Sequence, residues 1–291
     1  MPRPLRIGLP SGSLQEATLE LFRRAGYSIA RASRTYRPTI DDPNFEVRLL
    51  RAQEIAAYVQ DGFLDLGLTG SDWIQETRAK VQVVSTLRFS KATAQPARWV
   101  IAVPNRSPIR RPSQLRGKRI ATEAVGLVRQ YLRKHKIKAK VEFSWGATEV
   151  KVPELADAVV DITETGSSLA ANGLRILDTI LESYPQLISN RKSWTVPADR
   201  TRIQNLSMLL EGALRARDLV GLKMNVSRRC LRSVNSALSS LRDPTISPLA
   251  RDGWVAVETV MEEKIVRSII PRLKQLGAEG IIEYPLNKVV S

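Results

Sequence analysis

The feature that most constrains the fold is a repeated order of short apolar strand, small turn and helix. Residues 5–9 read as a strand, Pro10–Ser13 as a turn, and Leu14–Ala25 as an amphipathic helix stopped by Gly26. The same order returns at residues 64–72 and again at 158–174. Loops at the carboxyl ends of such strands gather on one edge of an open sheet, where ligands bind. We therefore predict an α/β fold with its site on these turns.

The turn after residues 158–162 carries the clearest functional signal. It reads Thr163-Glu164-Thr165-Gly166-Ser167-Ser168 and runs into a helical segment that ends near Gly173. Free backbone N–H groups and the helix dipole favour an anion there, and the hydroxyls add small donors. Asp161 and Glu164 would repel a phosphate but accept hydrogen bonds from sugar hydroxyls. The combination suits a ribose 5-phosphate, although an ordinary capped strand–helix connection has the same spacing.

The other two turns are secondary candidates. Gly12 and Ser13 follow the first strand, and Gly70 and Asp72 follow the strand at residues 64–69. Gly12 and Ser13 would bind an anion through backbone N–H groups and a hydroxyl. Asp72 is placed either to cap its helix or to contact a ligand.

The order of elements predicts two lobes and a terminal domain. Strands at 98–104, 118–121 and 141–143 form a second α/β unit, whereas a strand near 186–190 returns to the first. Two such lobes are similar to the periplasmic-binding-protein fold. Beyond Leu219 a β-α-β-β-α-β order predicts a ferredoxin-like (ACT-like) domain, in which Ser227 caps a helix running to Leu241. We predict three parts: 1–94 with 185–211, 95–184, and 212–291.

Composition excludes several classes of protein. The 291 residues are 43% hydrophobic and 25% charged, as in a globular protein. No apolar run reaches the ~18 residues of a membrane span, and no secretory segment follows Met1, so we expect a cytoplasmic protein. The single cysteine, Cys230, excludes an internal disulfide. The single histidine, His135, lies among lysines and an arginine, which argues against histidine chemistry.

The formal charge of +16 indicates an anionic partner. Nucleic acid is a minor alternative, because the basic residues spread from Arg3 to Lys288 without an interleaved aromatic platform. Small polyanionic substrates explain the charge more economically. A binding protein without catalysis is a further alternative, but it would seldom need the diol site at Asp161 and Glu164.

Several segments together resemble the ATP phosphoribosyltransferase family of histidine biosynthesis. These are Leu9–Leu14, Asp65–Gly70, Asp161–Leu174 and Gly277–Ile282, and the likeness extends from Arg6 to Val289. It implies transfer of the phosphoribosyl group of phosphoribosyl pyrophosphate to N1 of ATP, with Mg²⁺ present and held mainly by substrate oxygens. It also implies that Asp161 and Glu164 assist catalysis. The implied substrate-binding residues are Gly12, Ser13, Gly70, Asp72, Arg98, Thr148, Thr165, Gly166, Ser167, Ser168 and Leu169.

The terminal domain resembles that of the long form of the family. This resemblance implies a regulatory module that binds histidine as feedback inhibitor, a homo-oligomer between dimer and hexamer, and independence from a partner subunit. A purely structural appendage is the alternative. The sequence departs from the family at Ser11 and Ser13, where basic residues are common, and at Lys223-Met224-Asn225, where acidic residues are common.

Overall fold

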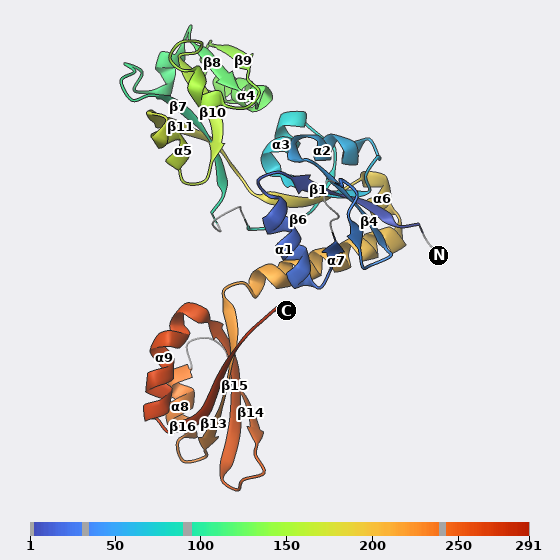
Figure 1. Cartoon of the computed structure of the whole chain (residues 1–291), viewed down its shortest axis with the longest axis vertical. Coiled ribbons are helices and arrows are strands. Elements are labelled where there is room, and N and C mark those ends of the chain that lie inside the picture. Colours follow the sequence, from blue (N-terminus) through green and yellow to red (C-terminus); the bar gives the residue numbers. More distant parts are fainter. Residues whose placement is uncertain (1–2, 31–34, 90–94, 239–242, 291) are drawn as a thin grey trace. The chain divides into compact units, whose positions relative to one another are not determined.

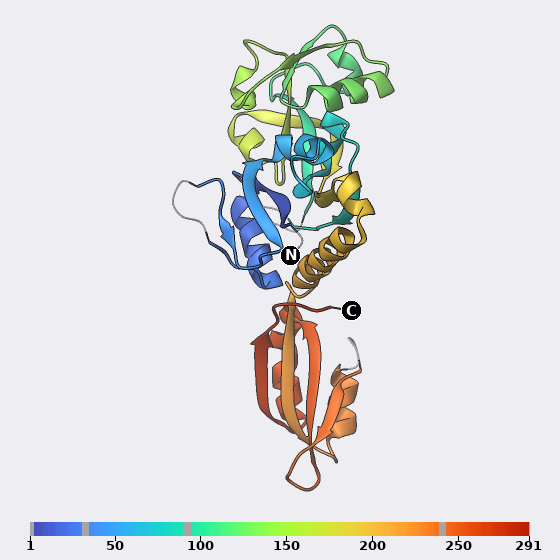
Figure 2. The same cartoon turned by 90° about the vertical axis from the view of Figure 1, so that its right-hand side faces the viewer.

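A computed structural model describes residues 3–30, 35–89, 95–238 and 243–290. The chain divides into two compact units (Figures 1 and 2). Unit 1 comprises Met1–Arg23 with Tyr27–Ser207, and unit 2 comprises Arg24–Gly26 with Met208–Ser291. In the described residues, no helix combines the length and apolarity that a membrane crossing requires.

The first sheet of unit 1 has the strand order β4-β1-β5-β12-β6. Strand β1 lies parallel to β4 and β5, whereas β12 lies antiparallel to β5 and β6. The strands are β1 (Leu5–Ser11), β4 (Phe45–Arg51), β5 (Leu66–Gly70), β6 (Gln82–Thr86) and β12 (Pro185–Ser189); β2 (Ile29–Ala30) and β3 (Thr39–Ile40) form a separate ribbon. The accompanying helices are α1 (Gln15–Ala25), α2 (Ala52–Gln60), α3 (Ser71–Thr77), α6 (Arg191–Thr195) and α7 (Pro197–Arg215); the last residues of α1 and α7 belong to unit 2.

Close packing of α2 on this sheet depends on a glycine. A Cβ added at Gly67 would lie 2.4 Å from Ile55 Cγ2. Ile55 is fully buried, together with Val59 one turn later. The absence of a side chain on β5 therefore lets the apolar face of α2 rest directly on the strand.

The second sheet has the order β11-β7-β10-β8-β9, in which β8, β9 and β10 are parallel and β7 runs antiparallel to β10 and β11. Its core includes Trp99, Ile101 and Ile120. The strands are β7 (Ala97–Pro104), β8 (Arg119–Thr122), β9 (Lys140–Phe143), β10 (Ala158–Thr163) and β11 (Leu174–Ser183). The helices are η1 (Pro112–Leu115), α4 (Val125–Lys134), η2 (Thr148–Lys151) and α5 (Ser167–Ala171).

Unit 2 confirms the predicted β-α-β-β-α-β order. Its antiparallel sheet has the order β14-β15-β13-β16, and both helices cover the same face (Figure 2). Val234 of α8 and Leu273 of α9 are fully buried in one core with Leu222 and Val257 of the sheet. The elements are β13 (Leu219–Ser227), α8 (Leu231–Leu238), β14 (Thr245–Pro248), β15 (Trp254–Glu262), α9 (Glu263–Gln275) and β16 (Ala278–Pro285).

Some local predictions were wrong. Ser227 ends strand β13, opposite Trp254, and α8 begins four residues later, so Ser227 does not cap it. The predicted end of that helix at Leu241 lies outside the described residues. Strands β6 and β11 were not predicted at all.

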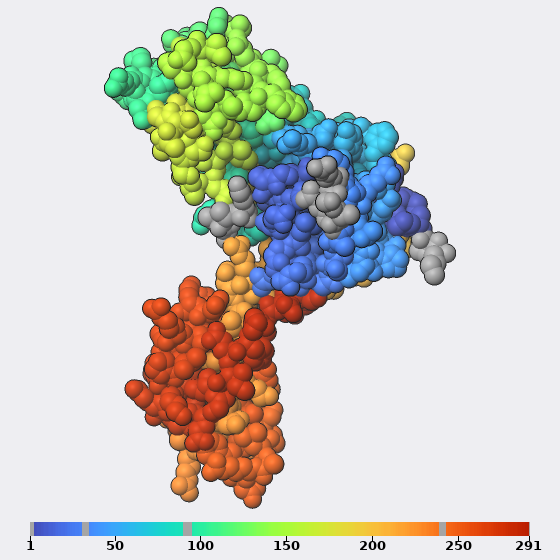
Figure 3. Space-filling model, in the orientation of Figure 1, coloured from blue at the N-terminus to red at the C-terminus, as the bar shows by residue number. Residues whose placement is uncertain are grey.

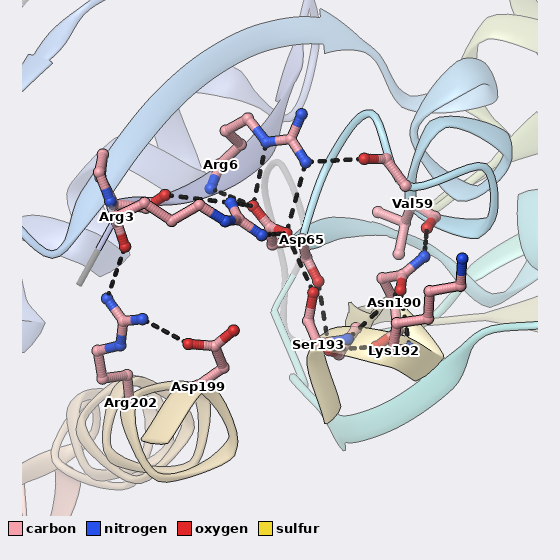
Figure 4. A network of polar contacts seen from close by, with 12 residues as sticks. Arg3, Arg6, Val59, Asp65, Asn190, Lys192, Ser193, Asp199 and Arg202 are labelled. Atoms are coloured by element: carbon pink, nitrogen blue, oxygen red, sulfur yellow. Dashed lines mark hydrogen bonds and ion pairs between the residues drawn. The ribbon is translucent and has the colours of Figure 1, made fainter. Parts of the chain in front are cut away.

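A buried carboxylate fixes the amino-terminal end of β5 (Figure 4). Asp65 is 2% exposed and accepts hydrogen bonds from Arg3, Arg6 and Ser193 at 2.8–3.1 Å. Burial disfavours its charged form, but the hydrogen bonds from both arginines outweigh that cost and hold the pKa of Asp65 well below its ordinary value. The network joins β1, β5 and α6, at the end of β5 opposite to the turns discussed below.

Candidate active site

The predicted turns lie at the carboxyl ends of parallel strands. In the first sheet Ser11 pairs with Arg51 at the ends of β1 and β4, and β5 ends at Gly70. In the second sheet β8, β9 and β10 end at Thr122, Phe143 and Thr163. The carboxyl edge of a sheet is where open α/β folds bind ligands.

The loop after β10 satisfies much of its own hydrogen bonding. Gly166 N–H donates to Thr163 Oγ1 at 2.8 Å, and Ser167 N–H donates to Thr165 Oγ1 at 3.3 Å. Gly166 has a φ of 82°, which a side chain would strain. The N–H groups of Gly166 and Ser167, which were expected to bind an anion, thus donate to two threonine hydroxyls. A stronger acceptor, such as a phosphate oxygen, can replace these hydroxyls. The β10–α5 segment, yellow-green in Figure 3, is at the surface.

Asp161 stands at the carboxyl end of β10 in a setting that disfavours its charge. Burial, together with the nearby charges of Glu149 and Glu123, raises the pKa of Asp161 to about 6. A hydrogen bond of 2.7 Å from Ile162 N–H to Asp161 Oδ1 opposes the shift. A carboxylate with a pKa near neutrality and strong acceptor character is typical of a functional position.

A cavity of about 440 Å³ brings many of the predicted residues together. Its lining includes Glu164, Thr165, Ser167 and Ser168 of the loop after β10, together with Ser13, Gly70 and Asp72 of the first sheet's turns. Among the described residues that line it, the charged ones are Asp72 and Glu164, both acidic. The described residues of this lining therefore offer no cationic group for a polyanion.

Asp72 has a different position from the predicted cap. The N-cap of α3 is Gly70, and Asp72 is 2% exposed. Its carboxylate accepts hydrogen bonds from Trp99 Nε1 at 2.6 Å and Ser183 Oγ at 2.8 Å. The side chain thus fixes α3 against β7 and β11, because both carboxylate oxygens have partners on those strands.

The remaining predicted residues lie around the cavity rather than in its lining. Arg98 of β7 pairs with Thr163 at the end of β10, next to the loop. Thr148 is buried, and its hydroxyl lies 3.1 Å from Ser144 Oγ. Leu169 is buried beneath the loop, and Gly12 adopts a φ of 90° beside Ser13.

Two charged residues at this edge, Arg51 and Glu149, are not among the predicted site residues. Arg51 is exposed at the carboxyl end of β4, immediately before the cavity-lining Ala52. Glu149 of η2 accepts a hydrogen bond of 2.9 Å from Ser168 Oγ. The strand pattern around residues 45–50 could have drawn attention to Arg51, but nothing in the sequence spacing joins Glu149 to Ser168.

Comparison with known proteins assigns the family. The family model described as HisG, ATP phosphoribosyltransferase, matches residues 51–212, and the HisG C-terminal domain matches residues 216–288. The ATP phosphoribosyltransferase of Solibacter usitatus is 55% identical over 286 residues, covering 98% of this chain and 99% of the relative. That of Chlorobium luteolum is 54% identical, with 98% and 97% covered.

A solved structure agrees at the level of the fold. The ATP phosphoribosyl transferase (HisG:HisZ) complex from Thermotoga maritima includes a chain with a TM-score of 0.60 and 24% identity. The match covers 71% of this chain and 98% of that one. Two lobes with mixed sheets and the additional C-terminal sheet complete the agreement with the predicted architecture. The chain belongs to the ATP phosphoribosyltransferase family, in its long form with a C-terminal domain.

Proposed function

We propose that this ATP phosphoribosyltransferase joins phosphoribosyl pyrophosphate to ATP at the cavity beside the β10–α5 loop. The N1 lone pair of adenine attacks C1 of the ribose, while the bond from C1 to the pyrophosphate oxygen breaks and its electrons leave with pyrophosphate. The products are phosphoribosyl-ATP and pyrophosphate, and the reaction is the first step of histidine biosynthesis. The close relatives of the same name support this reaction.

The phosphoribosyl half would bind to the loop Thr165–Leu169 and to Asp161. The observation that carries this proposal is the loop at the cavity, whose N–H groups bond to its own threonine hydroxyls. The half-buried carboxylate of Asp161 lies on the strand that leads into this loop. Phosphate oxygens would take over the N–H groups that Thr163 and Thr165 now cover. Asp161, with Glu164 assisting, would accept the ribose hydroxyls.

Catalysis would rest on position and charge. The ribosyl centre becomes positive as pyrophosphate leaves, so an ionised carboxylate close to it lowers the barrier. Binding both substrates along one sheet edge removes the entropic cost of their encounter. Because burial and its neighbours raise the pKa of Asp161 to about 6, the group is ionised at neutral pH but sensitive to mild acid.

The pyrophosphate would need cations, which the described residues of the cavity lining do not supply. Arg51 and Arg98 lie at the ends of β4 and β7 closest to the turns and are candidates for this role. In the described part of the chain no three His, Cys, Asp or Glu side chains gather into a metal-binding group. Mg²⁺ would therefore take most of its ligands from phosphate and ribose oxygens and from water, and it would neutralise the leaving group.

Pyrophosphate release tests the proposed reaction. Purified protein supplied with ATP, phosphoribosyl pyrophosphate and Mg²⁺ should release one pyrophosphate for each phosphoribosyl-ATP formed. Omitting either substrate should abolish release. Equal release without ATP would instead indicate hydrolysis of phosphoribosyl pyrophosphate and would refute the transfer.

The C-terminal domain would bind histidine and support a homo-oligomer. Acidic residues are missing from the first strand at Lys223 and Asn225, but the neighbouring strands supply them. Glu258 of β15 lies opposite Lys223, and Glu279 of β16 lies opposite Asn225. Carboxylates there could receive the amino group or imidazole of histidine. The uncovered face of the sheet leaves room for a second copy.

A further inference from the structure

An exposed aromatic pair lies at the edge of the second sheet in unit 1. Phe143 and Trp145 are 59% and 76% exposed, and their ring centroids are 5.8 Å apart at an interplanar angle of 61°. Aromatic side chains of this size are usually mostly buried, so an exposed pair points to a partner. None of the roles described above uses them.

The strand order places this pair on the same edge as the loop Thr165–Leu169, here called the phosphoribosyl loop. Strands β10, β8 and β9 are parallel neighbours, with Thr122 opposite both Val160 and Phe143. Their carboxyl ends therefore face the same side. Because adjacent strands are separated by ~4.8 Å, the end of β9 lies roughly 10 Å along the edge from β10. A purine joined through N1 to a ribose held at Asp161 extends over this range.

The backbone that presents Trp145 is in an unusual conformation. Gly146 and Ala147 have φ values of 60° and 45°, so two successive residues are left-handed. For alanine this costs about 1–2 kcal/mol, and such strain is concentrated at functional sites. The strain is not needed to bury an apolar side chain, because Trp145 itself remains exposed.

Side-chain contacts hold the loop firmly in place. Ser144 Oγ lies 3.1 Å from Thr148 Oγ1 and receives a hydrogen bond from Lys151. Glu149, which follows Thr148, accepts the hydrogen bond from Ser168 of the phosphoribosyl loop. The aromatic pair is thus mechanically linked to the loop proposed to hold the 5-phosphate.

The loop after β10 and the end of β9 differ in chemistry, as do the polar phosphoribosyl group and the flat adenine of the product. The loop after β10 offers hydroxyls and carboxylates, whereas the end of β9 offers flat, uncharged aromatic surface. We infer that Trp145, supported by Phe143, is the surface on which the adenine of ATP stacks; this inference rests on the proposed function. Stacking of a base on an aromatic side chain contributes about 1–3 kcal/mol.

Substitution of Trp145 tests the inference in the full-length protein. Trp145→Ala should raise KM for ATP roughly ten-fold or more and weaken AMP binding in calorimetric titration by a similar factor. KM for phosphoribosyl pyrophosphate should not change, and Trp145→Phe should retain most of the affinity. Inhibition by ribose 5-triphosphate, which has no base, should be the same in wild type and Trp145→Ala.

Phe63→Ala is the matched control. Phe63 is 66% exposed and packs edge-on against Tyr58 at 6.2 Å, but it precedes β5 at the opposite end of the strand. AMP affinity should be unchanged in this variant.

Unchanged AMP affinity in an active Trp145→Ala enzyme would overturn the inference. So would a change of sedimentation mass without a change in AMP affinity, because it would show that a second copy covers the pair. A wild-type protein that forms no phosphoribosyl-ATP would instead refute the proposed function.

Discussion

At the scale of single residues, Asp161 has a position that favours function over stability. Its pKa is about 6 in the folded chain and 3.8 ordinarily. The folded state therefore binds this proton more tightly, so the contribution to stability is present below pH 3.8 and is lost as the pH rises through about 6. Ionisation of Asp161 at neutral pH therefore lowers the stability of the fold, which is expected where the reaction requires a negative charge.

The cost can be measured in the substrate-free protein. Asp161→Asn has no charge to bury, so this variant should be more stable than wild type at pH 8. The difference should shrink as the pH falls toward 4. Urea unfolding at pH 4, 6 and 8 would reveal the trend. A difference that is independent of pH would contradict the burial of the Asp161 charge.

Asp65 shows the opposite balance. Its charge is stabilised by arginines, and its pKa is depressed, so its contribution is present above pH 3.8 and is lost as the pH falls further. Asp65→Asn should lower the free energy of unfolding by about 2–3 kcal/mol at pH 7, because a buried neutral amide replaces the carboxylate that pairs with Arg3 and Arg6. Asp157→Asn is the control, since the Asp157 and Lys118 side chains are 36% and 43% exposed. That variant should lose less than about 1 kcal/mol in the same urea titration. Equal losses in the two variants would show that the hydrogen bonds of Asp65 stabilise the fold no more than an exposed ion pair does.

At the scale of elements, the sequence pattern located most strands and helices because their apolar periods and glycine stops are local signals. Strand β7, for example, runs from Ala97 to Pro104, within one residue of the predicted 98–104. Strand β11 could not be found in this way. It has register shifts after Ile176 and Thr179, so its alternation of buried and exposed residues is broken. Partners distant in sequence, such as Ser168 and Glu149, depend on tertiary packing and leave no local pattern.

Helix α4 depends on a cap from another element. Its N-cap residue, Ala124, provides no side-chain acceptor. Instead, Glu76 of α3 accepts from Gly126 N–H at 2.8 Å and Leu127 N–H at 2.7 Å. Glu76→Ala should reduce stability by about 1 kcal/mol, a typical value for loss of a cap. Thermal or urea unfolding would measure it, with the exposed Glu154→Ala as control. If both variants unfolded alike, the carboxylate would not be acting as a cap.

At the scale of the whole molecule, the division into two units predicts that catalysis belongs to unit 1 and regulation by histidine to unit 2. Unit 1 contains the whole of the cavity described above, and unit 2 has its own core. A chain that ends at Glu211 should still form phosphoribosyl-ATP. It should no longer be inhibited by histidine, and its sedimentation mass should correspond to a smaller assembly. Histidine inhibition that survived the truncation would place the effector site in unit 1.

The net charge of +16 also belongs to this scale. A basic surface attracts substrates that carry several phosphates and speeds their encounter with the site. The second-order rate constant kcat/KM should therefore fall as salt is raised from 50 to about 200 mM, whereas duplex DNA should bind weakly at physiological salt. Tight binding of random duplex DNA under those conditions would contradict this explanation of the charge.

The central claim is that Asp161 and the loop after β10 form the phosphoribosyl site. The most direct test is the rate of pyrophosphate release by Asp161→Asn at saturating ATP and phosphoribosyl pyrophosphate, at pH 8 where the wild-type carboxylate is ionised. We predict a fall in kcat on the order of 100-fold with an unchanged circular dichroism spectrum, because the carboxylate would no longer stabilise the positive ribosyl centre. A kcat close to that of the wild type would contradict the assignment.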